Sequence, residues 1–230
     1  MFERTNHRKF LKQAIKNSEA IIKYNFSDGR LIDFYDVAQG YTYDKLTMSY
    51  VNLIALEYMV EHNILSKEKF QEIKQQMEQL PLDHDFYPMT YVWDEKRYEY
   101  EDEINLIDQL YIALHLERAS VPTDHFMTLI KSIYEKEAKV YGRYDRVTKE
   151  NTVSYESVAV YALIVLYALE KGDIEFATTI WDKLDYFQVG ESSLNAYGGY
   201  IDETSYTTHS FDNLLALLAE GKIKSEQIIQ

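Results

Sequence analysis

The stretch that decides the fold runs from Glu103 to Leu116 and reads EINLIDQLYIALHL. Its apolar side chains recur at three- and four-residue steps, at Ile104, Ile107, Leu110 and Leu114. This spacing predicts a helix with one apolar face. Asn105 and Asp108 lie three residues apart near its beginning, so their side chains are expected on one side of the first turns. We therefore expect a helix that presents an amide and a carboxylate where the chain enters it.

The segment leading into this helix is both aromatic and acidic. Its aromatic residues are Phe86, Tyr87, Tyr91, Trp93, Tyr98 and Tyr100, and Asp and Glu residues stand between them. Sugar rings stack on aromatic side chains, and their hydroxyls bond to carboxylates and amides. The segment therefore predicts a carbohydrate site with Trp93, Tyr98 and Tyr100 as stacking platforms. The alternative is a loop that folds its aromatic side chains over the end of the helices.

Composition limits the classes of function. A chain of 230 residues with 46% hydrophobic content can bury a sizeable core, and we predict a single domain over residues 1–230. The net charge of −14 and the dispersed Lys and Arg residues argue against a nucleic-acid partner. No apolar run is long enough for a membrane span. The first residues lead into an amphipathic helix rather than a signal-peptide core, and the oligomeric state is not predicted.

Cofactor, metal and thiol chemistry find no support. The chain has no cysteine, which excludes disulfides and thiolate catalysis. Its six histidines are scattered without a His-x3-His pair, so no metal site is expected. No nucleophile-elbow pattern supports a Ser–His–Asp hydrolase. We predict that the protein needs no cofactor.

Helical segments alternate with long and short connections along the chain. Periodicity and capping residues predict helices at 4–24, 46–62, 66–79, 104–118, 122–137, 154–171, 173–184 and 209–219, and a short one from Ser225. Long Tyr- and Asp-rich loops begin at 28, 80, 139 and 186, at intervals of roughly fifty residues. This repetition predicts an all-α fold of helical hairpins, as a solenoid or a closed ring. Because antiparallel hairpins place every second connection at the same end, the four long loops are expected on one face.

That face is the predicted binding site. The candidate substrate-binding residues lie in its loops and in the first turns of its helices: Tyr43, Asp44, Trp93, Tyr98, Asn105, Tyr155, Glu156, Tyr200, His209 and Asp212. Capping is the alternative for the acidic residues, because a helix N-terminus favours a carboxylate by roughly 0.3–1 kcal/mol. Glu156 in particular fits either substrate binding or stabilisation of the helix N-terminus.

Three segments resemble a known family. They are Ile104–Tyr111, Tyr155–Tyr161 and Thr208–Leu215, and they resemble the C-terminal half of bacterial proteins related to glycoside hydrolase family eight. The resemblance extends from about Gly29 to Gly221. It implies an (α/α)6 toroid that acts on β-linked oligo- or polysaccharides, including exopolysaccharides. It also implies a location outside the cell or at its surface.

The resemblance places the general base of an inverting hydrolysis on Asp108. Such a reaction also needs a general acid about 6.5–9.5 Å away. The nearest match to the family's acid motif is the segment from Asp36 to Tyr41, which has Val37 in place of the acid. The resemblance therefore implies an incomplete toroid whose acid is missing from this chain, or the C-terminal part of a longer glycosidase. Two alternatives stay open: a non-catalytic glycan-binding or scaffold protein, and a helical-hairpin protein that binds a protein partner.

Overall fold

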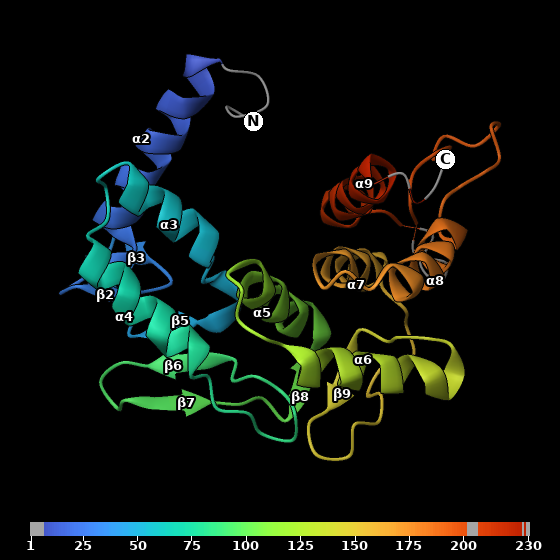
Figure 1. Ribbon diagram of the computed structural model, residues 1–230, viewed down its shortest axis with the longest axis horizontal. Helices are drawn as coiled ribbons and strands as arrows, with labels where there is room; N and C mark the ends of the chain where they lie inside the picture. Colours follow the sequence, from blue (N-terminus) through green and yellow to red (C-terminus); the bar gives the residue numbers. More distant parts are fainter. Residues whose placement is uncertain (1–6, 202–206, 227, 229–230) are drawn as a thin grey trace. The chain divides into compact units, whose positions relative to one another are not determined.

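A computed structural model of the chain describes residues 7–201, 207–226 and 228. Within them are eight α-helices, one short 3-10 helix and nine short strands (Figure 1). The predicted helical-hairpin fold is confirmed. The chain forms two compact units, which we describe separately: unit 1 comprises Met1–Pro81 and Pro88–Tyr100, and unit 2 comprises Leu82–Tyr87 and Glu101–Gln230. The prediction of a single domain stays a prediction.

Unit 1 combines three helices with three small antiparallel sheets. Its helices are α2 (Arg8–Tyr24), α3 (Leu53–Glu61) and α4 (Lys67–Glu78). Two hairpins pair β1 (Phe26–Ser27) with β2 (Arg30–Leu31) and β3 (Tyr35–Asp36) with β4 (Tyr41–Thr42). The third sheet has the order β5 (Lys45–Thr47), β6 (Thr90–Val92), β7 (Arg97–Glu99). The loop predicted from residue 80 thus contains two strands.

The helix predicted over 46–62 begins only at Leu53. Lys45 to Thr47 instead pair with β6, and a 3-10 helix, Met48–Tyr50, follows. Distant partners hold this segment extended: the Asp33 carboxylate accepts hydrogen bonds from the backbone N–H of Thr47 at 2.6 Å and from its hydroxyl at 2.7 Å. Tertiary contacts therefore override the local apolar periodicity, and Asn52 becomes the N-cap.

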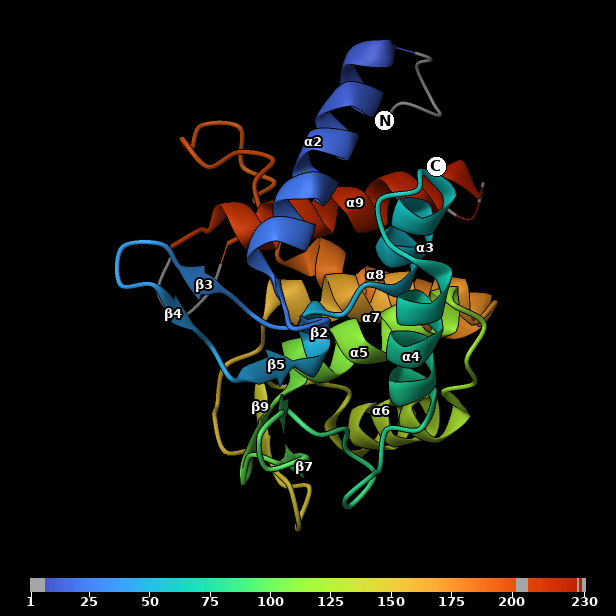
Figure 2. The same cartoon turned by 90° about the vertical axis from the view of Figure 1, so that its left-hand side faces the viewer.

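Unit 2 is built around helix α7 (Val158–Glu170). Its other helices are α5 (Leu106–Arg118), α6 (Asp124–Glu137), α8 (Ile174–Tyr186) and α9 (Ser210–Ser225). Helix α7 lies between α5 and α9 in two perpendicular views (Figures 1 and 2). Every residue of α7 from Val158 to Leu169 is buried, because its sequence is apolar on all sides. Helix α7 is therefore the core of unit 2.

Helices α5, α6 and α7 begin two to four residues later than predicted, and α9 ends six residues later. Helix α5 begins at Leu106 because β8 (Glu103–Asn105) pairs with β9 (Arg143–Asp145). Helix α7 begins at Val158 after its N-cap Ser157. Helix α9 continues through Gly221 to Ser225, so its predicted end at residue 219 is wrong. Ser225, predicted to open a separate final helix, is the last residue of α9, and most of the remaining residues of that prediction lie outside the described part of the chain. Ile223 is fully buried beyond Gly221, and its burial offsets the roughly 1 kcal/mol cost of a glycine inside a helix.

Candidate functional site

The N-terminal ends of α7 and α9, with the loops that precede them, enclose a pocket of about 180 Å³. Its lining consists of Tyr155, Glu156, Ser157, Val158, Tyr200, Thr207, Thr208, His209 and Asp212. Tyr155, Glu156, Tyr200, His209 and Asp212 had been predicted to bind substrate from the sequence. The structure brings these five residues together from three separate segments of the chain. Their role in binding stays a prediction.

Glu156 is held firmly in the pocket wall. Its carboxylate forms an ion pair with Lys139 at 2.9 Å and accepts a hydrogen bond from the Tyr161 hydroxyl. The hydrogen bond to Glu156 raises the pKa of Lys139, which keeps the ammonium group charged. Burial and the adjacent carboxylate raise the pKa of Tyr161, which keeps its proton in the bond. Glu156 thus presents a carboxylate in a fixed orientation.

Tyr155 forms the outer wall of the pocket and is 41% exposed. Its ring packs directly over Gly142: a Cβ atom on residue 142 would lie 3.1 Å from Cζ and 3.2 Å from the hydroxyl of Tyr155. The side chain of Arg143 hydrogen-bonds to Tyr155, and this contact is the main reason that the pKa of Arg143 is raised. A glycine at 142 therefore gives the Tyr155 ring its position.

The remaining predicted pocket residues differ in accessibility. His209 is exposed at the N-cap of α9, and Asp212 is half-buried in the first turn. Tyr200 is only 1% exposed, so it forms a wall of the pocket rather than an open stacking platform. Its hydroxyl is buried and has no hydrogen-bond partner among the described residues. Burial, with smaller contributions from Glu220 and Asp185, raises the pKa of Tyr200 to about 12.

In both α5 and α9, an amide side chain near the start of the helix holds the backbone of a preceding loop. Gln109 in α5 accepts a hydrogen bond from the backbone N–H of Tyr87 at 2.8 Å and donates to its carbonyl at 3.0 Å. Asn213 in α9 makes the same two contacts to Tyr200, at 2.9 and 3.0 Å. Each amide is the fourth residue of its helix. Asp108 and Asp212 directly precede these amides and therefore hold equivalent positions in the two helices.

Backbone contacts join the start of α5 to the pocket. The N–H of Leu106 donates to the carbonyl of Gly142 at 3.1 Å, and the N–H of Gly142 donates to the carbonyl of Tyr155 at 3.3 Å. Asn105 pairs with Arg143 across the two-stranded sheet. The N-terminal ends of α5, α7 and α9 thus belong to one end of unit 2, as the hairpin pattern predicted for its loops.

Asn105 and Asp108 occupy the start of α5 as predicted, in different roles. The Asn105 side chain is the N-cap and accepts a hydrogen bond from the N–H of Ile107 at 3.1 Å. Asp108 is half-buried in the first turn. Partial burial raises the pKa of nearby Glu101, and the negative charge of Asp108 adds to the effect. Glu101 and Asp108 therefore form an acidic patch at the beginning of α5.

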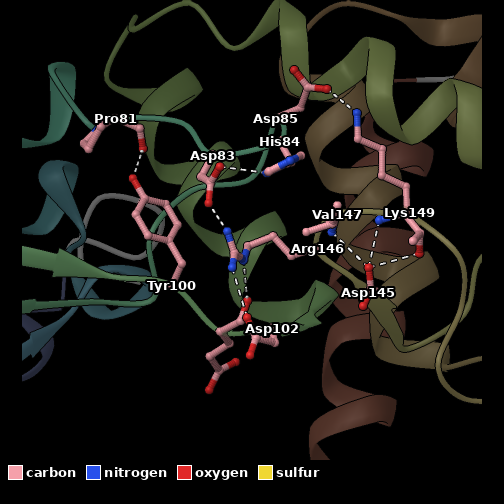
Figure 3. A network of polar contacts seen from close by, with 12 residues as sticks. Pro81, Asp83, His84, Asp85, Tyr100, Asp102, Asp145, Arg146, Val147 and Lys149 are labelled. Atoms are coloured by element: carbon pink, nitrogen blue, oxygen red, sulfur yellow. Dashed lines mark hydrogen bonds and ion pairs between the residues drawn. The ribbon is translucent and has the colours of Figure 1, made fainter.

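Arg146 fixes the chain just before this patch (Figure 3). Its guanidinium binds the carboxylates of Asp83 and Asp102, the latter at 3.0 Å, and donates to the carbonyl of Glu101 at 3.1 Å. Lys149 binds Asp85 in the same segment. Because the Arg146 side chain is only 18% exposed, these bonds are partly shielded from solvent. They hold residues 82–87 and 101–102 against the loop that follows β9.

The predicted residues Tyr43, Asp44, Trp93 and Tyr98 lie in unit 1, around the third sheet. The ring of Tyr43 stacks on Phe34 with centroids 4.9 Å apart, and Tyr98 packs against Tyr91 at the same distance. The indole N–H of Trp93 donates to the carbonyl of Leu31 at 2.8 Å, and its backbone N–H donates to the carbonyl of Asp44 at 3.0 Å. Packing within unit 1 thus accounts for much of the aromatic surface here.

Two kinds of feature are absent from the described residues. Over residues 7–201, 207–226 and 228, no group of three or more His, Asp or Glu side chains is arranged to hold a metal ion. Across the same part of the chain, none of the helices combines the length and the apolarity that crossing a membrane requires.

Sequence reasoning missed several residues that shape the site. Gly142 and Arg143 determine the position of Tyr155, while Gln109 and Asn213 fix the entering loops. A signal for the two amides was present, because an Asp–amide–Leu triplet occurs at 108–110 and again at 212–214. Gly142 and Arg143 have no local signal, since their importance depends on a residue that follows more than ten positions later.

Sequence comparison finds one informative curated relative. No family model matches the chain. The Bacillus subtilis (strain 168) protein named "Putative lipoprotein YdaJ" is 42% identical over 212 residues, which cover 90% of this chain and 56% of the relative. The chain thus spans little more than half of that relative's length.

Three solved structures share the fold. A novel alpha-amylase from Clostridium perfringens matches with a TM-score of 0.84 at 23% identity, over 95% of this chain and 66% of that one. PssZ from Listeria monocytogenes matches with a TM-score of 0.76 at 24% identity, over 96% of this chain and 64% of PssZ. An endo-1,4-D-glucanase from Vibrio fischeri ES114 matches with a TM-score of 0.63 at 12% identity, over 97% of this chain and 65% of the glucanase. At these identities the likenesses show a shared fold alone, and they do not confirm family eight.

Proposed function

We propose that this chain is the glycan-binding part of a polysaccharide-processing, glycoside-hydrolase-like protein. The observation that supports this most strongly is the pocket at the ends of α7 and α9. It combines the half-exposed ring of Tyr155, the fixed carboxylate of Glu156, and the imidazole and carboxylate of His209 and Asp212. A flat apolar surface beside directed hydrogen-bonding groups suits a sugar ring.

Asp108 is the proposed general base of an inverting hydrolysis. In this reaction the base takes a proton from water as the water attacks the anomeric carbon, and an acid protonates the leaving oxygen. Asp108 stands in the first turn of α5, where the positive helix end favours a carboxylate. No residue of this chain is assigned as the acid. The proposal for Asp108 therefore concerns one half of the catalytic pair.

The proposed location is the cell surface. It is supported by the relative that is named a lipoprotein, which covers 90% of this chain.

The test of the base measures reducing-end release from soluble polysaccharides. Starch and β-1,4-glucan are included because two solved relatives are titled alpha-amylase and endo-1,4-D-glucanase, and a bacterial exopolysaccharide completes the panel. Asp108→Asn is expected to lower turnover by about 10²–10⁴-fold with an unchanged melting temperature. Formate in excess is expected to restore reducing-end release to Asp108→Ala, because its carboxylate can accept the proton of the attacking water.

Asp102→Asn is the matched comparison. Asp102 precedes the same helix and its side chain is 96% exposed, and an asparagine keeps an oxygen for Arg146. The assignment predicts a small effect at 102 and a large one at 108. The reverse order would move the base to Asp102 and reject Asp108.

The alternative is a non-catalytic glycan-binding protein with a degenerate glycosidase groove. It is favoured because no residue of this chain is assigned as the acid, and even the nearest match to the family's acid motif has Val37 at the acid position. Saturable glycan binding without reducing-end release, even at high protein concentration, would select this alternative. Absence of both binding and release would reject the two functions together.

A further inference from the structure

We propose a second glycan-binding site on unit 2, in a hollow of about 420 Å³ between α6 and α8. It is lined by Tyr134 from α6 and by Thr179, Asp182, Lys183 and Tyr186 from α8. None of these residues lines the pocket at the ends of α7 and α9. The site thus lies apart from the pocket, and its ligand class rests on the proposed function.

Tyr186 provides an open aromatic surface. It is the last residue of α8 and is 72% exposed. Its ring meets Phe187 nearly at right angles, with centroids 6.2 Å apart, and Phe187 is buried. One edge of the Tyr186 ring is therefore anchored, while most of its surface remains accessible. A single tyrosine on a surface needs no special explanation, so its neighbours decide the argument.

Tyr134 gives the hollow a second, rigid aromatic wall. Its ring packs edge-on against Phe176 with centroids 6.0 Å apart. Partial burial raises the pKa of Tyr134, and the carboxylate of Asp182 contributes to this shift. The Tyr134 hydroxyl is thus a neutral donor close to Asp182.

The polar groups of the hollow retain hydrogen-bonding capacity. Among the described residues, neither Asp182 nor Lys183 takes part in an ion pair. The Thr179 hydroxyl donates to the carbonyl of Glu175 at 3.0 Å, which leaves its oxygen able to accept. Asp182 accepts and Lys183 donates. The hollow therefore contains both donors and acceptors in addition to the Tyr186 ring.

This combination fits a neutral oligosaccharide. A pyranose ring has an apolar face for Tyr186 and hydroxyls that both donate and accept. An anionic ligand would meet Asp182 and a chain with a net charge of −14. A hydrophobic peptide would leave Asp182, Lys183 and Thr179 without partners. A long glycan chain held here would raise the local concentration of polymer near the pocket, as linked sites do.

The test compares affinities for a polymer and for a short oligosaccharide by affinity electrophoresis and calorimetry. Tyr186→Ala is expected to weaken binding of the polymer about tenfold, equivalent to roughly 1.4 kcal/mol. It is expected to leave binding of a di- or trisaccharide of the same glycan at the pocket unchanged. Tyr186→Phe keeps the ring and should bind the polymer like the wild type. Leu218→Ala removes a 55% exposed side chain on α9 and serves as the matched control.

Three outcomes overturn the second site. If Tyr186→Ala binds the polymer as tightly as the wild type, the hollow binds no glycan. If it weakens polymer and short oligosaccharide equally, the hollow is not a separate site. If the wild type binds no glycan in the panel, the proposed function fails together with this site.

Discussion

Replacing Gly142 by alanine tests how the Tyr155 wall of the pocket is built. The new methyl group would lie 3.1 Å from Cζ of Tyr155 and closer still to its ring edge. Ordinary van der Waals contact needs about 3.5–4.0 Å. The ring must therefore move outward, which also breaks its contact with Arg143. Overpacking of this kind costs about 1–3 kcal/mol of unfolding free energy.

A double-mutant cycle isolates this clash. In a Tyr155→Ala background the ring is absent, so Gly142→Ala is expected to change stability by less than about 0.5 kcal/mol. Urea unfolding of the four proteins gives the coupling energy. Gly190→Ala is the control, because a Cβ atom at Gly190 would have no neighbour within 4 Å. An equal cost of Gly142→Ala in both backgrounds would refute the packing argument.

Two further predictions concern buried polar groups. Gln109→Leu leaves the backbone N–H and carbonyl of Tyr87 unpaired in the core, and urea titrations are expected to show an unfolding free energy lower by about 2–5 kcal/mol. The control is Gln13→Leu at an exposed position, which should have little effect. Equal effects of the two substitutions would contradict the stabilising role of the Gln109 hydrogen bonds. Burial lowers the pKa of His115 to about 4, so between 6.5 and 4 the unfolded state binds the extra proton and stability falls as pH falls. The difference between these two pKa values corresponds to roughly 3 kcal/mol of stability at about 1.4 kcal/mol per pH unit. The melting temperature of His115→Leu, measured from pH 7 to pH 4, should therefore fall less with pH than that of the wild type. The same dependence on pH in both proteins would contradict this role of His115.

The helical hairpins could be predicted because their signals are local. Apolar periodicity located all the long helices, and the capping residues Ser66 and Asp173 do accept hydrogen bonds from Lys69 and Phe176. The sequence of α7 is apolar on all sides from Val158 to Leu169, and all of these residues are buried. Because hairpins alternate in direction, the pattern also placed the loops before α5, α7 and α9 at one end of unit 2.

The features that were missed depend on partners far away in the sequence. Strand β5 forms because Thr47 meets Asp33 and β6, whereas its own sequence continues a helical pattern. Helix α9 passes through Gly221 because Ile223 is buried against its neighbours. Tyr200 was predicted as a sugar contact from its loop, yet packing buries all but 1% of it. Local sequence indicates which residue types are present, and tertiary packing decides which of them face the pocket.

The most direct test of the account is a crystal structure of the protein with an oligosaccharide from the glycan that it binds best. We predict a sugar ring in the pocket at the ends of α7 and α9, in contact with the Tyr155 ring and hydrogen-bonded to His209 or Asp212. A sugar bound elsewhere with this pocket empty, at saturating ligand, would contradict the central claim.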